Sequence, residues 1–392
     1  MPSRRALLRS LPAAATAAVA GCGTRARGMF ATEPPVTGPC DGPDAQWPTA
    51  GGDPGRTGRT DSAPPDADAE LTDLLAGVTV DGRRPLAGSL PAVGRGLAYV
   101  PSASGVVAIP LDASTDGPAW NHDLDDDVDA VPALGCGVVL VAGLNALVAL
   151  DPETGERYWR ADVGGHGETT VAFADETVYA AGVDPVALDV YTGAVGWRAT
   201  GGDTLAVDAD GVYSTRNVNG TGGIFAHDHD GTRRWHLSLG KIVASATVDD
   251  GTVLVPDTRG TVYAIDATTG ETHWSRSLDG VRKVFSGLAV RDSDVVVPAG
   301  TGETSAVLDA DTGKPRWTVD TGIVTGRPVI GDDWVAFGRT NVGVSVYDRA
   351  TGTHRVTWSR EAYDIGTVSG IVPVDDGFVI RGGTTSGLGL LR

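Results

Sequence analysis

A hairpin-like segment recurs seven times along the chain at nearly constant spacing. Its clearest copy, residues 264–274, reads Ala-Ile-Asp-Ala-Thr-Thr-Gly-Glu-Thr-His-Trp. Asp266 can accept hydrogen bonds from turn amides, and Gly270 can adopt the positive φ that closes a hairpin after a type I turn. Every copy ends in a tryptophan, and the seven are Trp120, Trp159, Trp197, Trp235, Trp274, Trp317 and Trp358. Their spacings of 39, 38, 38, 39, 43 and 41 residues predict propeller blades of four short strands.

The residues before each hairpin read as two further strands joined by a turn. In one copy the apolar run 253–256 is followed by a turn and a second apolar run over 260–265. Short β-branched runs bounded by Gly and Asp are typical of strands. We find no convincing helical periodicity after about residue 85, so we expect an all-β chain.

The seven tryptophan hairpins leave one fragment at each end of the repeat region. Residues 370–391 read as three strands of an eighth unit, and residues 71–80 read as one unpaired strand. Pairing these two fragments would remove both exposed sheet edges. We therefore predict an eight-bladed β-propeller over residues 71–392, with the N-terminal strand closing the last blade. Seven blades are the alternative if either fragment lies outside the ring.

The repeated pattern Ala/Val-x-Asp-x-x-Thr-Gly-x-x-x-Trp resembles the PQQ-type β-propeller repeat. That repeat is shared by quinoprotein dehydrogenases and BamB-type lipoproteins, and the resemblance implies that the seven tryptophans dock between neighbouring blades. Residues 47–58 also look like the lead-in that these propellers often carry. The BamB-like resemblance implies a protein–protein adaptor. The matching residues are turn and docking residues, so they indicate the fold more than the function.

The first 22 residues read as an export signal. Arg4 and Arg5 form a twin-arginine pair, followed by a short apolar run that ends in Val19-Ala20-Gly21-Cys22. This ending resembles a lipobox, so we expect Tat export, cleavage before Cys22 and lipidation of its sulfur. An ordinary secreted protein cut nearby is the alternative. Residues 23–70, rich in Pro, Gly, Asp, Thr and Ala, are expected to be a flexible linker.

Charge and composition indicate where the protein works. The net charge is −19, and only three of the 31 basic residues are lysines, at positions 241, 283 and 314. An acidic, lysine-poor surface looks like adaptation to high salt, which screens the repulsion between carboxylates. A halophilic archaeon is therefore the hypothesis for the source. The same charge argues against nucleic acid as a partner.

Two clusters have the residue types of a metal site. His227-Asp228-His229-Asp230 falls on a repeat turn, where strand alternation separates neighbouring side chains, so a structural or solvated role is favoured. The acidic run Asp123, Asp125, Asp126, Asp127 and Asp129 lacks the glycine and terminal glutamate of a calcium loop, so a solvated surface is favoured. We therefore assign no metal ligands.

Two modifications are also compatible with the sequence. If Cys22 is lipidated, Cys40 and Cys136 remain and can pair in an oxidising compartment. Asn219 begins an Asn-x-Thr sequon and is a candidate for N-glycosylation.

Catalytic residues cannot be assigned. Quinoprotein dehydrogenases of this fold carry an adjacent Cys-Cys pair and a bound calcium, and this sequence has neither the pair nor recognisable calcium ligands. The sequence leaves catalysis open and favours a non-catalytic, cofactor-free scaffold. We expect a monomer, lipid-anchored on the extracytoplasmic face of the membrane, that binds another surface or envelope protein. A dehydrogenase using PQQ with calcium, and a carbohydrate- or small-ligand-binding surface protein, are the alternatives.

Overall fold

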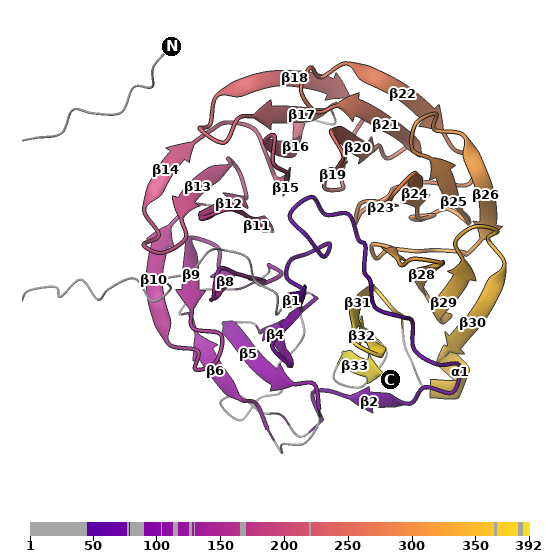
Figure 1. Cartoon of the computed structure of the whole chain (residues 1–392), viewed down its shortest axis with the longest axis horizontal. Coiled ribbons are helices and arrows are strands. Elements are labelled where there is room, and N and C mark those ends of the chain that lie inside the picture. The colour runs from indigo at the N-terminus through magenta and orange to yellow at the C-terminus, as the bar shows by residue number, and fades with distance from the viewer. Residues whose placement is uncertain are drawn as a thin grey trace, which may run out of the picture. The chain divides into compact units, whose positions relative to one another are not determined.

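The computed structural model describes residues 45–76, 78, 90–102, 104–112, 117–124, 128, 130–164, 170–218, 221–363, 367–382 and 387–392. These residues form eight β-sheets arranged in a ring, which confirms the predicted eight-bladed propeller (Figure 1). Four residues with predicted roles, Arg4, Arg5, Cys22 and Asn219, lie outside the described residues, as does Cys40. No helix in the described part of the chain is both long enough and apolar enough to span a membrane.

Every blade is an antiparallel sheet whose strands run in order from the central channel to the rim. Blade 1 contains β1 (Ala45–Trp47), β3 (Ala92–Gly94), β4 (Leu97–Pro101), β5 (Gly105–Pro110) and β6 (Trp120–Asp123). Blade 2 contains β7 (Ala133–Gly135), β8 (Val138–Ala142), β9 (Ala146–Leu150) and β10 (Arg157–Asp162). Blade 3 contains β11 (Thr170–Ala174), β12 (Thr177–Ala181), β13 (Val186–Asp189) and β14 (Val195–Arg198). Blade 4 contains β15 (Thr204–Val207), β16 (Val212–Val218), β17 (Thr221–His227) and β18 (Arg233–Leu239).

The second half of the ring repeats this arrangement. Blade 5 contains β19 (Thr247–Asp249), β20 (Thr252–Pro256), β21 (Thr261–Asp266) and β22 (Thr272–Ser277). Blade 6 contains β23 (Ala289–Arg291), β24 (Asp294–Val297), β25 (Thr304–Asp309) and β26 (Pro315–Asp320). Blade 7 contains β27 (Val329–Ile330), β28 (Trp334–Arg339), β29 (Gly343–Asp348) and β30 (His354–Ser359), followed by the single helical turn α1 (Arg360–Tyr363). Blade 8 contains β31 (Gly370–Val374), β32 (Gly377–Arg381), β33 (Leu388–Leu391) and β2 (Leu71–Asp73).

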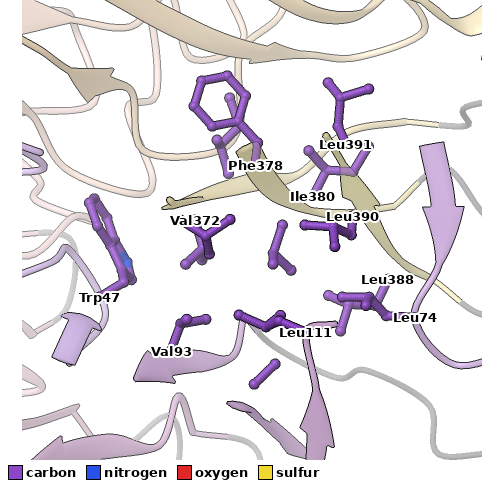
Figure 2. Close-up of a cluster of buried hydrophobic side chains, with 14 of the residues drawn as sticks. Trp47, Leu74, Val93, Leu111, Val372, Phe378, Ile380, Leu388, Leu390 and Leu391 are labelled. Carbon is purple, nitrogen blue, oxygen red and sulfur yellow. The ribbon is translucent and has the colours of Figure 1, made fainter. Parts of the chain in front are cut away.

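The N-terminal strand closes the ring, as predicted. β2 pairs antiparallel with β33, and Leu71 lies opposite Leu391. The strand is shorter than the expected 71–80, because the Asp73 carboxylate accepts a hydrogen bond from the Leu75 amide and the chain turns there. Figure 2 shows the buried cluster at this junction, to which Leu74, Val93 and Phe378 contribute from separate parts of the chain. Both ends of the propeller sequence therefore share one apolar core.

Neighbouring blades are joined by the seven repeat tryptophans. Each indole nitrogen donates to a backbone carbonyl that belongs to the following unit, at 2.7–3.2 Å. In chain order the acceptors are the carbonyls of Pro152, Val190, His229, Ala267, Ala310, Arg349 and Asp66. Asp66 precedes the closing strand β2, so the N-terminal segment supplies the acceptor that blade 8, which has no Asp-to-Trp hairpin, does not provide.

The turn glycines lie directly against these indoles. A Cβ atom added to any of six glycines would come within 2.8 Å of the tryptophan ring of the preceding blade, and these are Gly155, Gly193, Gly231, Gly270, Gly313 and Gly352. All six also have a positive φ. Glycine is therefore required at each position for two reasons, the positive φ of the turn and the close approach of the indole ring.

We expect Gly313→Ala to destabilise the protein more than Gly322→Ala does. The two glycines have nearly the same φ, 65° and 63°, but an added Cβ meets the Trp274 ring at 2.5 Å only at Gly313 and nothing within 4 Å at Gly322. Backbone strain alone should cost about 1–2 kcal/mol in both variants. Overpacking against Trp274 should add roughly 1–3 kcal/mol in Gly313→Ala, and thermal unfolding of the two variants measures the difference. Equal melting temperatures of the two variants would contradict the close packing of the Trp274 ring on Gly313.

The turn aspartates bind the amides of their own hairpins. Asp266 Oδ1 accepts from the Thr268 and Thr269 amides at 3.1 and 2.6 Å. Asp348 makes the same bonds with Ala350 and Thr351 and also accepts from Arg355 at 2.6 Å. Hydrogen bonds from Arg355 and Thr351 lower the pKa of Asp348 to about 2.

Asp348→Asn should destabilise the protein near pH 5 but have little effect near pH 2. Because the folded pKa of about 2 lies below the ordinary value of 3.8, the ionised carboxylate stabilises the fold above that ordinary value. This contribution is lost as the pH falls through about 2. The wild type should therefore unfold at a higher temperature than Asp348→Asn near pH 5, and the difference should shrink towards pH 2. Asp311→Asn, at an exposed turn position, is the control, and a pH-independent difference would contradict the assignment.

The expected linker over residues 23–70 is wrong for residues 45–70, which are part of the propeller. Residues 47–60, called the crossing segment below, pass through the interior of the ring (Figure 1). Five of its carbonyls accept hydrogen bonds from innermost strands of five blades, pairing Pro48 with Leu134, Pro54 with Val207, Gly55 with Val248, Thr57 with Val290 and Gly58 with Ile330. The segment is Pro- and Gly-rich because it must follow the channel wall with its backbone.

Candidate functional site in the central channel

A cavity of about 320 Å³ lies inside the ring and is lined by residues from all eight blades. The cavity is lined by Thr204, at the start of β15, and by Arg327, just before the start of β27. The crossing segment forms hydrogen bonds with the other ends of these strands, at Val207 and Ile330. The crossing segment therefore closes one end of the channel and forms the floor of the cavity. Phe285 also lines the cavity and is 45% exposed, so the cavity reaches the surface beside it.

Arg56 is the charged residue of this floor. It has a φ of 58°, unusual for a residue other than glycine, and its side chain is only 4% exposed. Its Nη1 donates to the Ala50 carbonyl at 2.9 Å and to the Ser245 hydroxyl at 3.3 Å. The strained backbone and the two bonds hold the guanidinium at the base of the cavity.

Arg327, which lies just before the first strand of blade 7, packs against the same floor. Its Nη1 donates to the Arg56 carbonyl at 2.5 Å, to the Thr247 hydroxyl at 3.1 Å and to the Leu288 carbonyl. Its guanidinium lies against Gly287, where an added Cβ would stand 2.2 Å from Nη2. Arg327 is 8% exposed, so two arginine side chains are buried side by side.

Burial lowers the pKa of both guanidinium groups without removing their charge at neutral pH. The pKa of Arg56 falls to about 10 through desolvation, and that of Arg327 to about 9 through desolvation and the charge of Arg56. Asp53 opposes both shifts, but its carboxylate is bonded to the Thr57 amide at 3.0 Å and paired with Arg59 at 3.4 Å. The two buried charges therefore lack a carboxylate in direct contact among the described residues.

Unpartnered donors gather at this cavity. Nine buried side-chain nitrogen or oxygen atoms have no hydrogen-bond partner among the described residues, and five of them belong to residues that line it. These five are Trp47 Nε1, Arg56 Nε, Arg56 Nη2, Ser286 Oγ and Arg327 Nη2. All five can donate a hydrogen bond, so the residues that line the cavity have spare donor capacity.

The histidine cluster singled out in the sequence lies elsewhere, at the turn after β17. His227 is buried and stacks on Trp197, with ring centroids 6.3 Å apart, and burial lowers its pKa. His229 lies near the Ala209 carbonyl through Nε2 and near the Tyr179 hydroxyl through Nδ1, at 3.2 and 2.7 Å. Since a carbonyl only accepts, Nε2 donates to Ala209. The two rings pack between blades 3 and 4.

Of the acidic and cysteine candidates, the described residues Asp123 and Cys136 do not line the central cavity. Asp123 ends β6 at the rim of blade 1, and Asp125, Asp126, Asp127 and Asp129 lie outside the described residues. Cys136 is in a disulfide and lies in the turn between β7 and β8. Across the described ranges no three His, Cys, Asp or Glu side chains are arranged to hold a metal ion.

A calcium-bound quinone does not fit the described cavity. A hard cation such as calcium requires oxygen ligands, usually including carboxylates, but the described lining contains three arginines, Arg56, Arg327 and Arg381, and no acidic side chain. Cationic side chains at this density would repel the metal. We therefore derive no redox step for this site.

Reasoning from the sequence missed both arginines of the cavity. Residues 47–58 were identified only as a lead-in, although Arg56 stands in their glycine-rich run. The strand register places Arg327 at the position of Ser245 in blade 5 and Gly287 in blade 6. An arginine at a repeat position held by Ser245 and Gly287 in the two preceding blades is the signal that was available.

Comparison with known proteins supports the same fold. A family model described as "Outer membrane protein assembly factor BamB" matches residues 103–212 and 220–364, more than half of the chain. No curated protein sequence matches significantly.

Three solved structures illustrate the fold. BamB from Moraxella catarrhalis is 18% identical, with a TM-score of 0.62 over 78% of this chain and 94% of that one. A quinohemoprotein alcohol dehydrogenase from Comamonas testosteroni is 17% identical, with a TM-score of 0.67 over 87% and 77%. A europium-containing methanol dehydrogenase is 14% identical, with a TM-score of 0.64 over 88% and 91%. At these identities the likeness establishes the fold alone. The family match agrees with the seven tryptophan hairpins and the eight closed blades. This chain therefore belongs to the PQQ-type β-propeller family described by the BamB model.

Proposed function

We propose that the protein is a non-catalytic, membrane-tethered scaffold that binds another envelope or surface protein on the extracytoplasmic side. The observation that carries this proposal is a pair of exposed apolar side chains on one face of the ring. Phe285 and Ile323 are 45% and 42% exposed, whereas nearly all other large apolar side chains in the described part of the chain are buried or half-buried. Exposed apolar groups gathered on one face mark a protein-binding surface.

Phe285 and Ile323 lie in equivalent connections of adjacent blades. Phe285 is in the connection from β22 to β23, and Ile323 is in the connection from β26 to β27. Both connections lead from the rim to the channel, so they lie on the same face of the ring. Gly300 joins them, because it forms β-bridges with Arg282 of the first connection and Val324 of the second. The two apolar side chains therefore stand on one hydrogen-bonded platform, called the apolar platform below.

Family membership supports binding of proteins in general. BamB is described as an outer membrane protein assembly factor. We carry over from it the binding of other proteins and leave the outer-membrane role aside, because the acidic, lysine-poor composition favours an archaeal host. The cavity's lack of described acidic side chains favours this role over a calcium-dependent dehydrogenase.

Loss of the apolar platform should abolish partner capture. The double variant Phe285→Ser/Ile323→Ser removes both exposed side chains and leaves the buried core unchanged. Val195→Ser is the matched control, because Val195 is 43% exposed but lies on the outermost strand of blade 3. Chemical cross-linking in intact cells at high salt should give a defined adduct with the wild type and the control, but not with the double variant. An adduct that persists in the double variant would contradict the assignment of this face.

The tether is tested separately. Cys22→Ser should prevent lipidation and release the exported protein from the membrane fraction into the medium. Replacing Arg4 and Arg5 with lysines should instead retain the precursor inside the cell, because the twin-arginine signal is lost. Cell fractionation distinguishes these outcomes. A Cys22→Ser protein that stays in the membrane fraction would refute the lipid anchor.

A further inference from the structure

The arginines of the central cavity have more donor capacity than the protein uses. Each guanidinium carries five N–H groups. Arg56 directs Nη1 to two acceptors, while its Nε and Nη2 have none among the described residues. Arg327 likewise directs Nη1 to three acceptors and leaves Nη2 without one. Both side chains are more than nine-tenths buried and both residues line the cavity, so these donors lie in the wall of a solvent-restricted site.

The charge of the site requires more than a hydrogen-bond acceptor. Water can accept bonds from guanidinium groups, but it does not neutralise two positive charges that are buried next to each other. Buried charges are ordinarily paired with an opposite charge. No described acidic residue lines the cavity. The protein as a whole has a net charge of −19, so the positive charge of the cavity is a local feature.

We infer that the cavity binds the oxyanion group of a small molecule, a carboxylate or a phosphate, between Arg56 and Arg327. Two guanidinium groups match the several acceptor oxygens of such a group, and the Ser286 hydroxyl supplies a further donor. The volume of about 320 Å³ lies at the lower end of the range for ligand pockets, which favours a small molecule over a peptide segment. This binding activity goes beyond the proposed scaffold role and does not depend on it.

The position of the cavity links the ligand to the apolar platform. Phe285 lines the cavity and is also half of that platform. Ser286, the next residue, carries one of the unpartnered donors. An anion bound to Ser286 would therefore lie next to the apolar platform.

Isothermal titration calorimetry of the purified full chain, at one constant high KCl concentration, tests the inference. The probes are inorganic phosphate, succinate and uncharged glycerol. We expect saturable binding of one phosphate or one succinate per chain and no binding of glycerol. The better of the two anions identifies the oxyanion as phosphate-like or carboxylate-like. Arg56→Gln and Arg327→Gln should each weaken this binding by at least about tenfold, because each removes a charge-assisted donor pair.

The control variant is Arg276→Gln. It removes the same charge from a half-buried arginine on the rim strand β22, whose Nε donates to the Gly313 carbonyl at 3.1 Å, and should leave the affinity within about twofold. If an arginine variant does not fold, Arg327→Lys and Ser286→Ala take its place, and each should weaken binding several-fold. Absence of saturable binding by both anions, or an affinity unchanged in the folded cavity variants, would overturn the inference.

Discussion

The contact between a tryptophan of one blade and the turn glycine of the next is the interaction on which this propeller depends. Each of the seven indoles donates to a carbonyl of the following unit, and six of the seven rings also cover a turn glycine that has no room for a side chain. One contact thus couples the hairpin turn to the packing between blades. Trp358 donates to the Asp66 carbonyl, so the N-terminal segment supplies the last of the seven acceptors. The ring therefore has no open edge.

Ring closure brings the N-terminal segment into the channel, and this placement creates the site. Residues 47–60 bond through their carbonyls to innermost strands, so they need no apolar side-chain pattern of their own. One consequence is that Arg56 is buried at the base of the channel, where Arg327 donates to its carbonyl. The same segment therefore bonds to the innermost strands and also contributes an arginine to the donor-rich cavity.

The sequence predicted the parts of the fold that repeat. Tryptophan spacing and turn chemistry specified the blades, and the unpaired strand specified the closure, although Asp73 ends that strand earlier than expected. The crossing segment was mistaken for linker because backbone-mediated contacts leave a Pro- and Gly-rich sequence that resembles a disordered one. Arg327 was missed because only strand register shows that its position faces the channel. Long-range juxtaposition of single residues is not encoded in a local pattern.

A crystal structure of the protein purified at high salt, without added anions other than chloride, is the most direct test. If the channel is an anion-receiving cavity in a binding protein, density for a small oxyanion-bearing molecule should lie in contact with Arg56 and Arg327, above the crossing segment. A quinone stacked over a metal ion in the channel would contradict it, and would make the protein an oxidoreductase.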